Sequence, residues 1–190
     1  MSHGFELKPA QAGVDPDTPA LLQPVAQALH WINQAMVVMG MLALLVASCV
    51  LTYSVVSRYV MKASTDWQDE AAVFCLVGAT FMCGAFVQQL RGHVGIEAVA
   101  GLLPRAVNRL RLALVDLMCT AFCSFFAWKS WTLFHEAWAE GQTTSSSWAP
   151  PLWIPYGLMA AGMTLLSLQL LVQLTARVNG LFKPRQGALA

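Results

Sequence analysis

Four long apolar stretches constrain the fold of this chain more than any other feature of its sequence. They cover about residues 35–56, 71–90, 112–134 and 153–175. An α-helix rises 1.5 Å per residue, so about 20 apolar residues cross the roughly 30 Å hydrocarbon core of a bilayer. Each stretch is long enough. We therefore predict an all-α integral membrane protein with four transmembrane helices in one membrane domain over residues 34–178.

The composition supports the same class. Hydrophobic residues make up 57% of the chain and charged residues only 11%, which leaves too little polar surface for a soluble domain of this length. The net charge of +1, without a dense basic cluster, excludes a nucleic-acid-binding protein that works by bulk electrostatics. We expect the chain to contact the lipid bilayer and no nucleic acid.

The segments that flank the membrane domain differ from it in composition. Residues 1–19 are rich in Pro, Asp, Gly and Gln, and we expect a flexible tail there. Residues 20–33 carry apolar side chains at spacings of three and four, which predicts a short amphipathic helix on the membrane surface, with Pro24 favouring a kink. We expect residues 179–190 to form a second, cytoplasmic tail.

The basic residues indicate how the spans are oriented. They gather in the N-terminal segment, in the connection between the second and third spans, and after the fourth span. These residues are Lys8, Arg91, Arg105, Arg109, Arg111, Arg177, Lys183 and Arg185. The opposite side has only Arg58 and Lys62, next to three acidic residues. Because Lys and Arg are enriched in cytoplasmic loops, we expect both termini to be cytoplasmic.

The connection after the second span begins with the sequence QQLRGHVGIEAV, residues 88–99. Apolar positions on one side of the following segment predict a short helix on the cytoplasmic surface. In that position His93 is a polar interfacial residue, placed to bond Glu97 one turn later. The alternative is a ligand or proton-relay role for His93, and the sequence leaves both open.

Small residues recur every four positions in the second span and, more weakly, in the fourth. They are Ala71, Cys75, Ala79 and Cys83, and then Gly157 and Ala161. Small side chains let two membrane helices approach closely. We expect these faces either to pack within the four-helix unit or to dock on another subunit.

The candidate chemical groups do not form a reactive site. The four histidines, His3, His30, His93 and His135, fall in the N-terminal tail or near span ends. A membrane haem carrier needs histidines inside its spans, and a self-contained transporter has ionisable groups or broken helices near the midplane. The five cysteines form no CxxC motif, and we expect them to pack as small hydrophobes. We expect no cofactor, no metal site and no enzymatic activity.

Two charged residues lie inside the third span, near its ends. Asp116 stands about one turn inside the cytoplasmic boundary, where the positive end of the helix dipole favours a carboxylate. Its candidate partners are Arg91, Arg109 and Arg111. Lys129 is close enough to the outer interface to extend its ammonium group into the headgroup region.

Several short motifs, taken in order, carry a family resemblance. They are SRYV (57–60), WQDE (67–70), GAT (78–80), RGHVGIE (91–97), LLPR (102–105) and WIPY (153–156). Their order and spacing, over about residues 30–178, resemble the small permease subunit, the DctQ type, of tripartite ATP-independent periplasmic (TRAP) transporters.

The resemblance implies a complex in the bacterial inner membrane. In that family the small subunit binds a large permease subunit, which holds the sodium and substrate sites and moves them in an elevator motion. A periplasmic solute-binding protein delivers the substrate, an organic acid with a carboxylate. The small subunit adds to the static scaffold of this sodium-driven symporter. His93 and Glu97 match the family's surface-helix motif, which implies a positional role for them.

Residues at the outer ends of the first two spans are candidates for structural contacts. Arg58 is placed to pair with Asp69 or Glu70 and so to hold the helical hairpin together. Tyr59 and Trp67 lie in the same cluster, where simple anchoring at the membrane interface explains them equally well.

The outer connection GQTTSSSWAPPLWIP contains Trp148 and Trp153. It is either part of the platform that the binding protein contacts or an ordinary outer loop with interfacial aromatic residues. Two rival functions remain. One is a membrane anchor of a redox complex that carries haem or quinone, and the other is a small independent channel or exporter.

Overall fold

The computed structural model describes residues 19, 22–62, 66–90 and 105–182. Its helices are α1 (Gln23–Val56), the π-helical turn η2 (Ser57–Met61), α2 (Asp66–Gln89), α4 (Arg105–Ala139) and α5 (Trp153–Phe182). Four helical segments are long and apolar enough to cross a membrane, which confirms the predicted fold class. His93 and Glu97 lie outside the described residues.

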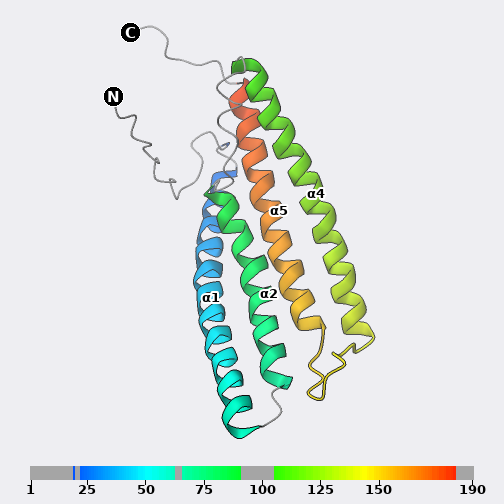
Figure 1. The fold of residues 1–190 in the computed structure, drawn as a ribbon. Coiled ribbons are helices and arrows are strands. Elements are labelled where there is room, and N and C mark those ends of the chain that lie inside the picture. The colour runs from blue at the N-terminus through cyan, green and yellow to red at the C-terminus, as the bar shows by residue number, and fades with distance from the viewer. Residues whose placement is uncertain (1–18, 20–21, 63–65, 91–104, 183–190) are drawn as a thin grey trace, which may run out of the picture.

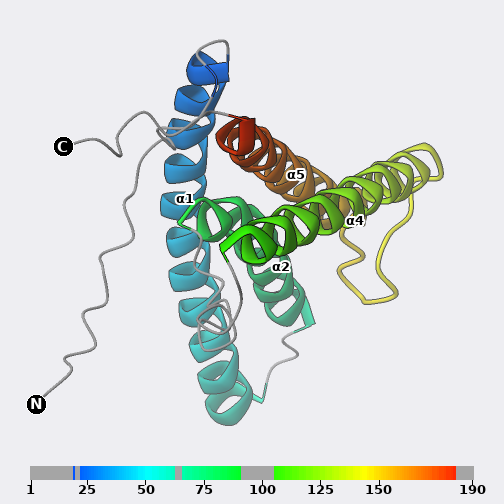
Figure 2. The ribbon, with the colours of Figure 1, turned by 90° about the horizontal axis from the view of Figure 1, so that it is seen from above.

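The four long helices form a bundle with α2 and α5 at its centre (Figure 1). α1 packs on α2, α4 packs on α5, and α2 packs on α5, with a smaller contact between α1 and α5. Seen from above, α1 runs in a different direction from α4 and α5, so the helices cross obliquely (Figure 2). We call the end where α1 begins and α5 ends the terminal end, and the other the hairpin end.

The surface helix predicted for residues 20–33 is not a separate element. α1 begins at Gln23 and continues without a break to Val56. Pro24 lies in its first turn, where backbone N–H groups have no partner within the helix, so the proline causes no kink there. With η2, the first helical segment has 39 residues, or about 58 Å at 1.5 Å per residue, so it must lean or project beyond the hydrocarbon core.

Small side chains let α1 approach α2 closely. The buried residues Ala26, Asn33, Gly40, Ala47 and Ser54 recur every seven positions along α1. A seven-residue repeat keeps one seam of a helix against its partner in the manner of a coiled coil. At Gly40, an added Cβ would lie 3.7 Å from Ala79 Cα and would collide with Cys83 Sγ. Ala79 and Cys83 of the small-residue face of the second span therefore pack within the unit.

The central helices touch at Gly162 of α5. An added Cβ there would lie 2.6 Å from the carbonyl carbon of Phe81 and 2.9 Å from its Cβ. On the other side of α5, a Cβ added to Gly157 would lie 3.1 Å from the ring of Phe134 on α4. Gly157, one of the two small residues predicted to form a contact face, thus packs against α4, and Gly162 packs against α2.

We predict that Gly162→Ala destabilises the bundle by about 1–3 kcal/mol, the range for overpacking a well-packed contact. The new methyl group would meet backbone atoms of Phe81, which cannot rotate away. The measurement is thermal unfolding of the purified protein in detergent. Gly84→Ala is the matched control, because its Cβ would lie 4.0 Å from Leu166, an ordinary contact distance. Equal melting temperatures for the two variants would contradict the predicted contact.

Candidate functional site

Polar side chains between the helices gather at the terminal end of the bundle. Their members come from all four long helices, and we call them the terminal polar layer: His30, Asn33, Gln88, Gln89, Asp116, Gln169, Gln173 and Arg177. Among the residues that the structure describes, no group of three or more His, Cys, Asp or Glu side chains could hold a metal ion.

Asn33 is the centre of one half of this layer. Its side chain is completely buried, and its Nδ2 donates to Gln89 Oε1 on α2 (3.2 Å) and to Gln169 Oε1 on α5 (3.0 Å). Gln89 Nε2 in turn lies 2.6 Å from His30 Nδ1. Because Gln89 Nε2 is the donor, this ring nitrogen is the acceptor. One amide from α1 thereby joins three helices.

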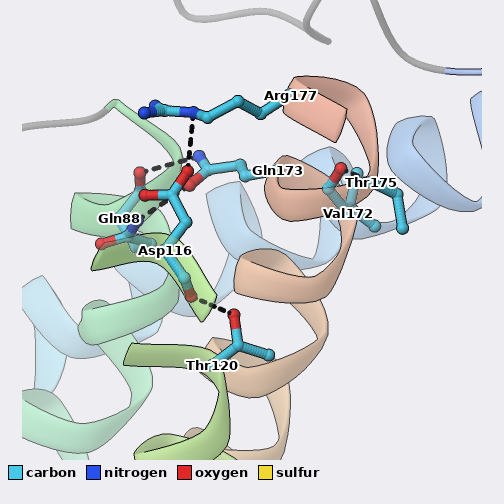
Figure 3. Close-up of polar contacts among 7 residues, drawn as sticks. All are labelled: Gln88, Asp116, Thr120, Val172, Gln173, Thr175 and Arg177. Carbon is cyan, nitrogen blue, oxygen red and sulfur yellow. Dashed lines mark hydrogen bonds and ion pairs between the residues drawn. The ribbon is translucent and has the colours of Figure 1, made fainter. Parts of the chain in front are cut away.

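Two further pairs complete the layer between the other helices (Figure 3). Gln88 Nε2 donates to Gln173 Oε1 (2.8 Å), and Gln173 Nε2 donates back to the backbone carbonyl of Gln88 (3.0 Å), which links α2 to α5. Asp116 on α4 forms an ion pair with Arg177 on α5 at 2.8 Å, and each side chain is only 18% exposed. Gln173 and Arg177 are one helical turn apart, so the two pairs lie close in depth.

The partner of Asp116 differs from the three predicted arginines. Arg91 lies outside the described residues. On a straight helix Arg111 is five positions from Asp116 and points about 140° to one side. Arg177 meets Asp116 because α5 runs antiparallel beside α4, so that its last turns lie next to the first turns of α4. The two residues are far apart in the chain, so this contact cannot be predicted from local spacing in the sequence.

At the hairpin end, Arg58 Nη2 pairs with Asp69 Oδ2 at 3.0 Å. This confirms one of the two predicted partners. Ser54 Oγ also donates to Asp69 Oδ1 (3.2 Å), a contact that the sequence did not suggest. Glu70, the other predicted partner, is half-buried, and within the described part of the chain its Oε2 has no hydrogen-bond partner. Consecutive helix residues point about 100° apart, which separates the two carboxylates.

Aromatic contacts tie the α4–α5 connection to the hairpin end. Trp148 in the connection packs edge-on against Trp67 at the start of α2, with ring centroids 6.4 Å apart. Trp153 at the start of α5 packs edge-on against Trp138, at 4.9 Å. Tyr59 is 89% exposed, as expected of an interfacial residue. The connection is thus attached both to its own helices and to α2.

Backbone hydrogen bonds also order this connection. Thr144 N donates to the carbonyl of Pro150 (3.1 Å), and Leu152 N donates to that of Gln142 (2.9 Å). The segment is therefore a narrow turn with paired sides rather than an open loop, even though it contains no charged residue after Glu140.

Between the two ends, the buried hydroxyl groups of the described residues are satisfied within their own helices. The buried hydroxyl groups of Thr120, Ser130 and Ser167 each donate to a backbone carbonyl four positions earlier in their own helix.

Cys49 and Cys119 are exposed on helix surfaces rather than buried as expected. The arrangement can hold four helices in one register, and its described residues bring no reactive group to the middle of the bundle.

The terminal polar layer is the feature that sequence reasoning missed. Its signal was the presence of uncharged amides near the same end of three spans, including Gln169 and Gln173 at a spacing of four. Asn and Gln side chains commonly hydrogen-bond between membrane helices. Their pairing, however, depends on the helix crossing, which no periodicity reveals.

A comparison with protein families gives one match. The family model described as "Tripartite ATP-independent periplasmic transporters, DctQ component" matches residues 47–180, well over half of the chain. A search of curated proteins finds no match.

We predict that Asn33→Ala lowers the free energy of unfolding by about 1–3 kcal/mol, because it leaves the acceptors of half-buried Gln89 and buried Gln169 without their donor. Unfolding in mixed micelles measures the loss. Gln34→Ala, at the adjacent exposed position, is the control and should be nearly neutral. An Asn33 variant as stable as this control would show that the amide does not join the helices.

A double-mutant cycle tests the ion pair between α4 and α5. We expect Asp116→Asn and Arg177→Gln to be coupled by about 1–3 kcal/mol, because each change removes the same partly buried contact. The same cycle with Arg111→Gln in place of Arg177→Gln should be nearly additive. Coupling to Arg111 rather than Arg177 would contradict the observed pairing. The readout is again unfolding in mixed micelles.

Proposed function

The chain belongs to the DctQ component family of the tripartite ATP-independent periplasmic transporters, and we propose that it acts there as a static scaffold. It is a multi-pass membrane protein and a transporter component rather than an enzyme. The proposed partner is a large permease subunit that carries the sodium and substrate sites and moves them across the membrane. The proposed transport process is sodium-driven uptake of an organic acid.

One observation supports the scaffold role above all. Many of the polar side chains between the helices pair across helices near the two ends of the bundle, while Asn33 Oδ1 and Gln68 Oε1 are buried without a hydrogen-bond partner in the described part of the chain. A subunit that carried the substrate would need polar or ionisable groups exposed to a path near the midplane. Here the buried mid-span hydroxyl groups bond to their own helices. The chain is therefore suited to hold its shape while a partner moves.

We further propose that the protein lies in the bacterial inner membrane with its terminal end in the cytoplasm. The excess of Lys and Arg near the terminal end supports this orientation. The hairpin end then faces the periplasm, where the ordered α4–α5 connection with exposed Trp148 is available to the solute-binding protein. His93 and Glu97 would have a positional role on the cytoplasmic side.

The rival function is a membrane anchor of a redox enzyme complex. His30 is the histidine that enters the helix interfaces, and its Nδ1 is bonded to Gln89. Within the described residues, no second histidine forms part of the terminal polar layer. An axial pair of histidines for a haem iron is therefore not formed by this layer, which favours the scaffold role.

Purification from the native membrane tests the proposal. We expect a C-terminally tagged chain, extracted in mild detergent, to bring down one larger membrane protein in a fixed ratio. Mass spectrometry identifies the partner, and the absorption spectrum reports haem or flavin. A chain that purifies only as a homo-oligomer, or with a partner that carries haem or flavin, would overturn the scaffold role.

A further inference from the structure

A groove opens between the first two helical segments at the hairpin end. Its lining residues are Leu51, Ser54, Val55, Arg58, Tyr59 and Asp69, and its volume is about 540 Å³. We call it the hairpin-end groove. Pockets that hold small organic ligands have volumes of about 300–1,000 Å³, so the hairpin-end groove is large enough for part of an amphiphilic molecule.

The groove changes from apolar to charged along the helix axis. Leu51, Val55 and Tyr59 are spaced by four residues and lie on one side of α1 and η2. Arg58 directly follows the apolar stretch, and Leu51 lies seven residues, or about 10 Å, deeper along the axis. The charged part of the groove thus lies at the hairpin end of the bundle, and its aliphatic wall extends from there toward the middle of the span.

Both signs of charge are accessible at this end of the groove. The side chains of Arg58 and Asp69 are 63% and 52% exposed, although they pair with each other and Ser54 Oγ donates to Asp69 Oδ1. A guanidinium has five N–H donors and a carboxylate about four lone-pair sites, so each group can bond a ligand while the ion pair persists. Arg binds phosphate well, and a carboxylate accepts hydrogen bonds from a primary ammonium group.

We propose that the hairpin-end groove binds a zwitterionic phospholipid with a primary ammonium group, of the phosphatidylethanolamine type. Its phosphate bonds Arg58, its ammonium group bonds Asp69, and one acyl chain lies along Leu51 and Val55. A phospholipid carries its phosphate between the ammonium group and the acyl chains, and Arg58 and Asp69 lie within 3.0 Å of each other, so one headgroup can reach both side chains. The site goes beyond the scaffold function and does not depend on it.

The lipid headgroup should decide affinity. In native mass spectrometry of the full-length chain, we expect one phosphatidylethanolamine to be retained about tenfold better than phosphatidylglycerol or phosphatidylcholine with the same acyl chains. Phosphatidylglycerol lacks the ammonium group, and the choline group has no N–H to donate. Asp69→Asn should remove the preference over phosphatidylcholine. Equal retention of the three lipids by the unaltered chain would overturn the proposal.

A pair of neighbouring variants tests the location without breaking the ion pair. Val55→Trp should fill the groove and reduce retention of phosphatidylethanolamine about tenfold. Val56→Trp is the matched control, because Val56 is similarly exposed (53% against 67% for Val55) but does not line the groove. Both substitutions are on exposed positions, so folding should persist, as helix content and melting temperature will show. Equal retention in the two variants would refute this site.

A photoreactive benzoylphenylalanine in place of Val55 tests the occupant in the native membrane. After irradiation, we expect an adduct with the mass of a phosphatidylethanolamine. A cross-link to a polypeptide would show that another protein covers the groove, and would overturn the proposal. The same photoreactive residue in place of Val56 controls for lipids that contact the helix without a site.

Discussion

Close contact between small residues is the constraint on which the rest of this bundle depends. In a bilayer, apolar side chains gain little by leaving lipid for another helix, so packing and hydrogen bonds must hold the helices together. Gly162 brings α5 against the backbone of Phe81, and Gly40 brings α1 against Ala79. At such short separations, polar side chains from different helices reach one another, and the terminal polar layer becomes possible.

Close packing brings the helices together, and the polar contacts then fix the register of each helix against its neighbours. Asn33 joins α1 to α2 and α5, and the pair of Asp116 with Arg177 joins α4 to α5. At the other end, the pair of Arg58 with Asp69 closes the α1–α2 hairpin. Contacts at both ends of the bundle oppose the sliding of one helix past another, because sliding would break them.

The sequence predicted the fold more completely than it predicted the contacts between the helices. Apolar length identified the four spans, and charge position identified Arg58 and a carboxylate at 69 or 70 as partners, because both signals are local. The prediction of a separate surface helix over 20–33 was wrong, because α1 runs without a break from Gln23 to Val56. The sequence pattern of a surface helix followed by a span is similar to that of one long helix, and only the few residues at the junction differ. The partner of Asp116 was missed because Arg177 is distant in the chain and comes close only through antiparallel packing.

The sequence by itself determined that this chain crosses a membrane with four helices, since that property follows from the length and polarity of single segments. It also determined the family, through the order of short motifs. Only the tertiary structure decided which amides pair, which carboxylate meets Arg58, and that a groove opens beside that pair. These features depend on the crossing of two helices and the rotation of each about its axis, and neither quantity is a property of one segment.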